Sequence, residues 1–333
     1  MSEVQFSKVA IVGAGAIGGW IGVHLARAGA QLSVLARGDT LAALQKNGLQ
    51  LHQAGTLHTA AVTASNDATQ LGVQDLVVIS VKAPALATVA AQVGPLIGPD
   101  TVVLTAMNGV PWWFLQGFGG PVQGQALSTV DPQGTIAKAI APQHIIGCVV
   151  HASCSVDAPG VIRHHFGDGL IVGEPSGQTT PRAQALHALL QAAGFNATLS
   201  PQIQKDIWYK LWGNMTVNPV SAITGATTDR ILDDDLVRGF ISSVMLEAKA
   251  IGERIGIPIA QEPEDRHAVT RKLGAFRTSM LQDVQAGKPV ELDALVSAVR
   301  ELGQLTGVAT PFTDALLGLS RLQARVLGLY PAP

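Results

Sequence analysis

The stretch KVAIVGAGAIGGWIGVHLARAGA, residues 8–30, decides the fold of this chain. Its first part, 8–15, is an apolar run that ends in glycines, which is typical of a buried strand. Its second part, 16–30, has helical periodicity and ends at Gly29, a common helix stop. The stretch therefore predicts a strand followed directly by a helix, with a glycine-rich turn between them.

The glycine-rich turn fits the pattern G-x-G-x-x-G, with the sequence Gly13-Ala14-Gly15-Ala16-Ile17-Gly18. Between a strand and a helix this pattern predicts a dinucleotide site, because the free amides and dipole at the helix start attract phosphates. Gly13 permits the tight turn, Gly15 lets the backbone approach a pyrophosphate, and Gly18 packs the helix against the strand. A merely compact turn is the alternative, but the position of the pattern favours dinucleotide binding.

The end of the second predicted strand indicates which dinucleotide binds. An acidic residue there would hold the ribose 2′-hydroxyl of NAD, whereas an arginine would favour the 2′-phosphate of NADP. The chain has Arg37 at this place, with Asp39 two residues later. We therefore expect NADP(H), with Arg37 as a cofactor contact, although an ordinary surface charge is the alternative for this residue.

The first two hundred residues alternate strand-like and helix-like runs. Strands are predicted at 31–37, 75–83 and 101–109, and helices at 16–30, 41–48, 84–97 and 182–194. Segment 49–65 is typical of hairpins, and 144–175 of antiparallel strands around a Pro-Gly turn. Strands that alternate with helices indicate right-handed crossovers and a doubly wound, mostly parallel sheet. The predicted fold is therefore α/β and Rossmann-like in this half of the chain.

Beyond about residue 200 the strand patterns end. Long helices are predicted at roughly 203–217, 233–256, 262–286, 290–307 and 312–327. We therefore expect an NADP-binding Rossmann-like domain at 1–200 and an all-α domain at 201–333 that carries the substrate and the catalytic residues. The long apolar helices leave both a homodimer and a monomer open.

The composition fits a globular enzyme, since 47% of the 333 residues are hydrophobic and only 14% are charged. A net charge of −2 and scattered basic residues argue against nucleic acid or an anionic membrane as partner. The apolar stretch near the amino end is too short for a membrane span. Only two cysteines are present, which favours a reducing compartment, so we expect a soluble, cytoplasmic protein.

The stretch WYKLWGNMTVNPV, residues 208–220, places Lys210, Asn214 and Asn218 four residues apart among large apolar side chains. On a helix these three polar groups lie within roughly 80° of one face. A buried lysine is costly unless it is paired or functional, and the alternative is a lysine whose amine reaches water. Pro219 disfavours helical geometry at Asn218, so we expect the helix to end or kink there.

Several motifs together resemble the ketopantoate reductases (2-dehydropantoate 2-reductases), which reduce a 2-keto acid with NADPH. They lie in the family's order: GAGAIG (13–18), VKA (81–83), NGV (108–110), WYKLWGNMTVNPVSAITG (208–225) and SMLQDVQAGKPVELD (279–293). The resemblance covers both halves of the chain, and its last two motifs are long and specific. It implies NADPH-dependent reduction of 2-dehydropantoate or a close analogue, as in pantothenate biosynthesis.

The resemblance also implies residue roles. Lys210 takes the place of the general acid, which burial would tune towards working pH. The residues implied to bind substrate are Asn108, Asn214, Asn218 and Ser279. The further residues implied to contact the cofactor are Lys82, Asn108, Ser153 and Glu291. The substrate is expected to lie in a cleft between the domains.

The chain also departs from the family pattern. Val296-Ser297 stands where many members have Asn-Gly, and segment 111–135 is longer than the usual connection. A larger or more apolar 2-keto acid is therefore open as the substrate. A reductase of the β-hydroxyacid dehydrogenase type and a non-catalytic NADP(H) sensor are alternative functions. We expect no metal site, because the histidines near Cys148 and Cys154 match no common zinc spacing.

Overall fold

The computed structural model describes residues 4–118 and 120–332, and the chain divides into two compact units. The first unit comprises Met1–Met107 and Gly134–Ile203, and the second comprises Asn108–Gln133 and Gln204–Pro333. The segment 108–133 therefore belongs to the second unit although it lies in the first half of the chain. The division into functional domains at residue 200 stays a prediction.

The first unit is built on a ten-stranded sheet with the order β4-β3-β9-β8-β7-β6-β1-β2-β5, and β10 pairs with β9. Its strands are β1 Lys8–Val12, β2 Gln31–Leu35, β3 Leu49–Gln53, β4 Thr56–Ala60, β5 Thr63–Ser65, β6 Gln74–Ile79, β7 Ile97–Thr105, β8 Ile145–Ala158, β9 Val161–Gly173 and β10 Asn196–Leu199. Among these described strands, β3–β4 and β8–β9 are antiparallel pairs and the others are parallel. The predicted α/β class, the hairpin at 49–65 and the antiparallel pair at 144–175 are confirmed.

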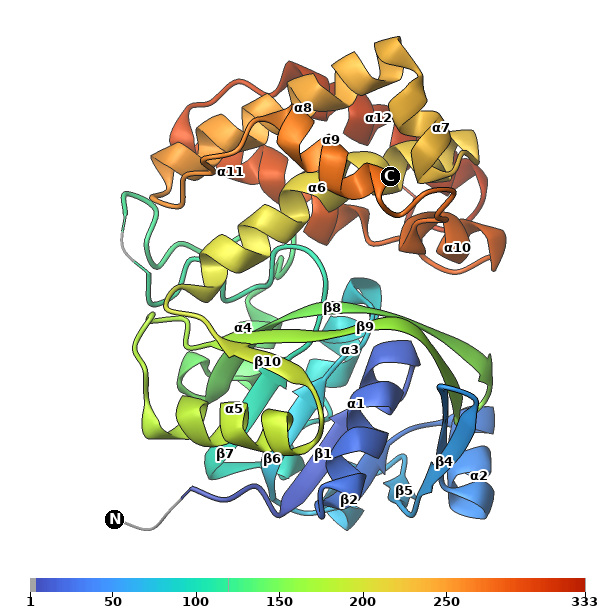
Figure 1. The fold of residues 1–333 in the computed structure, drawn as a ribbon. Helices are drawn as coiled ribbons and strands as arrows, with labels where there is room; N and C mark the ends of the chain where they lie inside the picture. Colours follow the sequence, from blue (N-terminus) through green and yellow to red (C-terminus); the bar gives the residue numbers. More distant parts are fainter. Residues whose placement is uncertain (1–3, 119, 333) are drawn as a thin grey trace. The chain divides into compact units, whose positions relative to one another are not determined.

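Helices cover both faces of this sheet (Figure 1). On one face lie α1 Ala16–Arg27, α2 Gly38–Asn47 and α5 Pro181–Ala192, and on the other α3 Leu86–Ala90 and α4 Thr135–Ala139. Fully buried Ile11, Trp20 and Leu186 belong to one hydrophobic cluster that joins β1, α1 and α5. Because the central strands β1, β6 and β7 are largely buried on both faces, the sheet becomes the centre of the unit's core.

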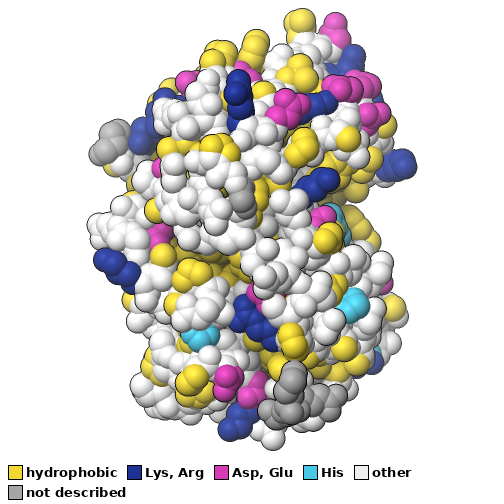
Figure 2. Space-filling model, turned by 90° about the vertical axis from the view of Figure 1, so that its left-hand side faces the viewer, with side chains coloured by type: hydrophobic (Ala, Val, Ile, Leu, Met, Phe, Trp, Pro, Cys, Tyr) yellow, Lys and Arg dark blue, Asp and Glu magenta, His cyan; other side chains and the backbone are white. Residues whose placement is uncertain are grey.

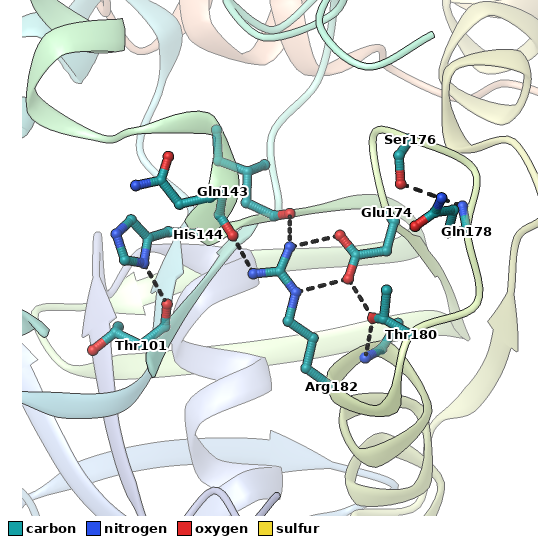
Figure 3. A network of polar contacts seen from close by, with 10 residues as sticks. Thr101, Gln143, His144, Glu174, Ser176, Gln178, Thr180 and Arg182 are labelled. Carbon is teal, nitrogen blue, oxygen red and sulfur yellow. Dashed lines mark hydrogen bonds and ion pairs between the residues drawn. The ribbon is translucent and has the colours of Figure 1, made fainter. Parts of the chain in front are cut away.

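An ion pair between half-buried Arg182 and buried Glu174 fastens α5 to the strands (Figure 3). Arg182 donates to Glu174 at the end of β9 through Nε at 2.7 Å and through Nη2 at 2.6 Å. The guanidinium also donates to the backbone carbonyls of Gln143 and Ile145, which precede and begin β8. Thr180, the N-cap of α5, donates to the same carboxylate at 2.5 Å. Each polar group of this pair is therefore matched, which a buried charge requires.

The first unit differs from the sequence-based expectation in two places. The predicted helix at 84–97 is interrupted, and α3 lies between two 3₁₀ turns at Ala83–Ala85 and Gly94–Leu96. Prolines stand within both 3₁₀ turns, and a proline cannot donate the backbone hydrogen bond that a longer helix needs. The strand β10 was not predicted, because its four residues carry too short a pattern.

The second unit is helical apart from the segment 108–133. Its helices are α6 Ile203–Thr224, α7 Thr228–Asp233, α8 Asp235–Arg254, α9 Pro263–Arg271, α10 Ser279–Gln285, the short π-helix η5 Asp293–Ser297, α11 Ala298–Thr306 and α12 Pro311–Val326. Buried Trp212 donates from its indole to the carbonyl of Met245, which ties α6 to α8. The helix α8 also packs against α7, α9, α11 and α12.

The segment 108–133 is held to these helices by aromatic and polar contacts. Phe114 packs against Trp208 of α6, with ring centroids 6.0 Å apart. The carboxylate of Glu301 on α11 accepts from the amides and hydroxyls of Ser128 and Thr129 at 2.6–2.9 Å. The backbone amides of Ser128 and Thr129, which lie outside any helix or strand, thus gain the partners that they need.

The helix α6 does not end at Pro219, so the helix end expected there was wrong. It continues to Thr224 because Val220 and Ala222 are buried, and their packing outweighs the lost backbone bond. Gln323 of α12 donates to the carbonyls of Ala222 and Ile223 and satisfies two of the last acceptors.

The predicted helix at 262–286 is two helices, α9 and α10. The chain turns at Gly274, which has φ +62°, and Thr228 donates to the carbonyl of Gly274. Thr278 then caps α10 by accepting from the amide of Leu281. A glycine stop followed by a threonine cap is readable in the sequence, and it places Ser279 at the first turn of a helix.

No described helix has both the length and the apolar character needed to cross a membrane. On the face drawn in Figure 2, the Lys and Arg side chains of the described residues lie scattered among other residue types and form no continuous basic band.

Candidate functional site

The glycine turn joins the carboxyl end of β1 to the start of α1. Gly13 has φ +94°, and a Cβ there would lie 2.9 Å from the amide nitrogen of Val81, so only glycine fits. Ser80, just after β6, donates its hydroxyl to the Gly13 carbonyl at 2.8 Å. The turn is thereby fixed between β1 and β6, where the strand order reverses and such sheets bind ligands.

The two remaining glycines of the turn have opposite surroundings. A Cβ on Gly18 would lie 2.2 Å from the Gly13 carbonyl oxygen, so this glycine allows the close contact of α1 with the turn. A Cβ on Gly15 would meet no atom within 4 Å. Gly15 is the N-cap of α1, and no described side chain caps the helix start, so its amides remain available to a ligand. This arrangement fits a pyrophosphate.

Three other predicted cofactor residues belong to the first unit. Arg37 follows β2 and is the N-cap of α2; its side chain is exposed and forms no hydrogen bond or ion pair with a described residue. Lys82 is exposed and follows β6. Ser153 lies on β8, opposite Phe166 of β9. Because β1, β2, β6 and β8 run in one direction, these residues all lie towards the carboxyl ends of the strands.

The second unit brings Lys210 and Asn108 together. The ammonium of Lys210 donates to Oδ1 of Asn108 at 2.9 Å, across 102 positions of sequence. Both side chains are half-buried. The sequence placed Asn108 beside the cofactor and substrate but did not reveal this contact, since no local pattern links a turn after β7 with a helix a hundred residues later.

The next two turns of α6 carry Asn214 and Asn218. Asn218 is buried and Asn214 half-buried, yet neither side-chain amide forms a hydrogen bond with a described residue. The hydroxyl of half-buried Ser279, at the start of α10, likewise has no described partner. Buried polar groups are normally paired, because an unpaired one costs about 1–3 kcal/mol. Such groups are suited to binding a ligand.

The turn at Asn108 is anchored to the segment that contains Glu291. The amide of Val110 donates to the carbonyl of Ala294 at 2.8 Å. A Cβ on Gly109, which has φ +82°, would lie 2.6 Å from the same carbonyl oxygen. Ala294 belongs to the π-helix η5, which begins two residues after buried Glu291. Single π-helical turns are often found at functional sites. The contacts of this turn with Val110 and Gly109 fix Asn108 near Glu291 in sequence segment 291–293.

Arg266, which no sequence motif identified, packs against Tyr209 and Gly213 of α6. The Arg266 guanidinium lies 5.6 Å from the centre of the Tyr209 ring, and a Cβ on Gly213 would lie 2.7 Å from its Nε. Burial lowers the pKa of Arg266, and its Nε has no hydrogen-bond partner. Gly213 therefore makes room for this side chain.

The described residues contain no cluster of three or more His, Cys, Asp or Glu side chains that could hold a metal ion. Cys154 is half-buried, and desolvation raises the pKa of its thiol to about 12. A thiol with so high a pKa is a poor nucleophile and a poor metal ligand at neutral pH.

Comparisons with known proteins place this arrangement in a family. The family model of ketopantoate reductase PanE/ApbA matches residues 9–177, and the model of its C-terminal part matches residues 202–324. The 2-dehydropantoate 2-reductase of Mesorhizobium japonicum is 46% identical over 324 residues, which are 97% of this chain and 99% of the relative. The chain belongs to the ketopantoate reductase family and is an oxidoreductase of that family.

Solved structures agree with this assignment. The crystal structure of a candidate ketopantoate reductase from Ralstonia solanacearum MolK2 is 57% identical, with a TM-score of 0.95 over 98% of this chain and 100% of the other. D-mandelate dehydrogenase, solved with NADH and anilino(oxo)acetate, has a TM-score of 0.83 over 97% of this chain and 99% of the other. It is only 21% identical, so it shows a shared fold alone.

Proposed function

We propose that this chain reduces 2-dehydropantoate, or a close 2-keto acid, with NADPH, and that Lys210 is the general acid. The observation that carries the proposal is the 2.9 Å hydrogen bond from Lys210 to Asn108. Asn214 and Asn218 follow on the same helix, with amides that no described residue pairs. Membership of the family supports the reaction type.

Reduction of a ketone places negative charge on the carbonyl oxygen, and the protein must stabilise that charge and supply a proton. The ammonium of Lys210 can donate a hydrogen bond to this oxygen and then transfer a proton to it. Asn108 accepts from the same amine, which restricts the directions that the amine can take. The bound cofactor supplies the hydride.

The unpaired polar groups can hold the rest of the substrate. Asn214 and Asn218 are neutral and can each donate and accept, so they can bind a hydroxyl or carbonyl without adding charge beside Lys210. The hydroxyl of Ser279 can donate to the carboxylate. Because all four residues belong to the second unit, we propose that this unit supplies the substrate contacts and the proton.

The first unit would hold the cofactor. The open space at Gly15 fits the pyrophosphate, and exposed Arg37 has no described partner that would compete with a 2′-phosphate. Lys82 and Ser153 are proposed as further cofactor contacts from this unit, and Asn108 and Glu291 as cofactor contacts from the second unit. D-mandelate dehydrogenase was solved with NADH, so the choice of nucleotide needs a direct test.

The test is steady-state oxidation of NADPH and of NADH over a panel of acids. The panel contains 2-dehydropantoate, larger and aromatic 2-keto acids, and 3-hydroxy acids with the oxidised cofactors. We expect turnover with 2-dehydropantoate or another 2-keto acid, and a higher kcat/KM with NADPH. Turnover of 3-hydroxy acids alone would favour a β-hydroxyacid dehydrogenase, and NADPH binding without any turnover would favour a sensor.

The variant Arg37→Ala separates the nucleotides. Loss of a contact to the 2′-phosphate should raise the KM for NADPH roughly tenfold or more and leave the KM for NADH unchanged. Arg27→Ala, at the end of α1, is a matched control that should change neither. Equal effects on both nucleotides would show that Arg37 does not select NADP.

A further inference from the structure

The residues that follow α12 return to the segment that carries Glu291. The carbonyl of buried Leu329 accepts from the amide of Val290 at 3.2 Å. The hydroxyl of the next residue, Tyr330, donates to Oδ1 of Asp293 at 2.6 Å. Glu291 itself is buried. The two residues after α12 therefore hold the chain on both sides of a residue that is proposed above as a cofactor contact.

The side chain of Tyr330 is fixed in its own place. It is half-buried, and the guanidinium of Arg325 lies 5.7 Å from the centre of its ring. Nε of the same arginine donates to the carbonyl of Pro331 at 2.9 Å. Burial, together with the hydrogen bond to Asp293, raises the pKa of the Tyr330 hydroxyl to about 12. This hydroxyl therefore stays protonated at neutral pH and can donate.

Asp293, which accepts from Tyr330, is the first residue of the π-helix η5. Its backbone carbonyl accepts the π-helical hydrogen bond from the amide of Ala298, five residues later. Its carboxylate accepts from Tyr330 and, at 3.1 Å, from the hydroxyl of Ser297. A π-helical turn is a rare conformation. Here two hydroxyls hold the side chain of the residue at which the turn begins.

The π-helix passes its position on to the turn at Asn108. The carbonyl of Ala294, the second residue of η5, accepts from the amide of Val110 at 2.8 Å. Gly109 lies so close to the same carbonyl that a Cβ there would come within 2.6 Å of its oxygen. Asn108 directly precedes this contact and accepts from the ammonium of Lys210 at 2.9 Å. A shift of η5 would therefore also shift the partner of the lysine.

We propose that Tyr330 is a positioning residue of the Lys210 site. Its hydroxyl fixes Asp293 and η5, and η5 fixes the turn that presents Asn108 to Lys210. Tyr330 acts through these residues and needs no contact of its own with substrate or cofactor. The kinetic consequence rests on the proposed function of Lys210 and Asn108, whereas the structural link from Tyr330 to the turn does not.

Hydrogen exchange followed by NMR tests the structural link without any substrate. Tyr330→Phe removes only the hydroxyl, and the buried amide of Val110 should then exchange about tenfold faster. Ser320→Ala is the matched control, because it removes a buried hydroxyl from α12 that has no bond to η5. It should leave exchange at Val110 unchanged. Far-UV circular dichroism should show that both variants are folded.

Substitutions of Asp293 provide a second test of the same link. Asp293→Ala should speed exchange at Val110 at least as much as Tyr330→Phe does. The two changes together should have no larger effect than Asp293→Ala alone, because they break one bond. Asp293→Asn keeps an oxygen that can accept from the Tyr330 hydroxyl, so it should keep exchange close to that of the unsubstituted chain.

Steady-state kinetics with NADPH and the preferred keto acid test the consequence for Lys210. Tyr330→Phe should lower kcat about threefold and change the KM for the keto acid less, since the lysine loses orientation while the substrate contacts remain. In the background of Asn108→Ala, the same change should lower kcat no further. A merely structural role of Tyr330 would lower kcat by the same factor in both backgrounds.

The outcomes separate this proposal from the proposed function. Unchanged exchange at Val110 in Tyr330→Phe would overturn the positioning role, and so would an equal loss of kcat with and without the Asn108 side chain. Faster exchange at Val110 together with normal turnover of Asn108→Ala would support the link from Tyr330 to the turn. That result would contradict instead the role proposed for Asn108.

Discussion

The glycine turn, residues 13–18, and the Lys210 cluster are built in different ways. The Lys210 cluster consists of Lys210, Asn108, Asn214 and Asn218. The turn is six consecutive residues, and its properties come from the backbone: a positive φ at Gly13, a close contact at Gly18 and open space at Gly15. The cluster joins Asn108 to Lys210 across 102 positions, with unpaired amides on the same helix. The first site is local and tolerates almost no added volume at Gly13 and Gly18, whereas the second depends on side chains that long-range packing brings together.

The largest effect should come from the lysine of the cluster. Lys210→Ala removes the proposed proton donor, so kcat should fall by about 10²–10⁴-fold while the protein stays folded. Lys205→Ala is a matched control, because Lys205 is exposed on the same helix, and it should keep normal turnover. Steady-state kinetics with NADPH and the preferred keto acid give the comparison. Near-normal turnover of Lys210→Ala would remove the lysine from the chemistry.

Two glycine variants test the packing and the cofactor site of the glycine turn separately. Gly18→Ala forces a Cβ to within 2.2 Å of the Gly13 carbonyl, so the free energy of unfolding should fall by about 1–3 kcal/mol. Gly15→Ala has space and a φ of −80°, so its stability should be unchanged, but its affinity for NADPH should fall about tenfold or more. Denaturant titration and cofactor binding measure the two effects. Equal stability losses would contradict the assignment of open space to Gly15.

The third expected effect concerns the partner of the lysine. Asn108→Ala removes an acceptor that restricts the direction of the Lys210 ammonium, and kcat should fall about tenfold. Binding of NADPH should change less than kcat if Asn108 acts mainly through Lys210. The double variant Asn108→Ala with Lys210→Ala should be no slower than Lys210→Ala alone. Additive losses would mean that the two residues act independently.

The smallest effect should come from the attachment of segment 108–133. Burial alone would raise the pKa of Glu301, but hydrogen bonds from Thr129 and Ser128 outweigh it and hold the pKa below its usual 4.5. A lowered folded pKa stabilises the fold above the unfolded value, and this contribution is lost as the pH falls through the folded pKa. Glu301→Gln should therefore reduce the loss of stability on acidification below pH 4.5. Hydrogen exchange at the amides of Ser128 and Thr129 should become faster.

The same contrast explains what the sequence could predict. Local periodicity sets the α/β class and the helical second half, and Gly13 and Gly18 set the glycine turn. These features could therefore be predicted from the sequence. The family motifs identified Lys210, Asn214 and Asn218 from the sequence alone. The roles assigned to these residues remain predictions, because a resemblance gives a position in a motif and not a measured contact.

The errors arose where tertiary packing decided the outcome. Pro219 predicted the end of a helix, but buried Val220 and Ala222 and the side chain of Gln323 keep α6 helical to Thr224. The contact between Lys210 and Asn108 could not be derived, since it depends on how the segment 108–133 lies on the helices. Arg266 was missed because a single arginine on an amphipathic helix carries no local pattern.

Rescue of Lys210→Ala by small primary amines tests the central claim most directly. If Lys210 supplies a proton to the substrate, added amines of suitable size should restore part of kcat in proportion to their concentration. Asn218→Ala, which should lose substrate binding and keep the proton donor, should gain nothing from the same amines. Failure of every amine to raise the rate, or equal stimulation of both variants, would contradict the role given to Lys210.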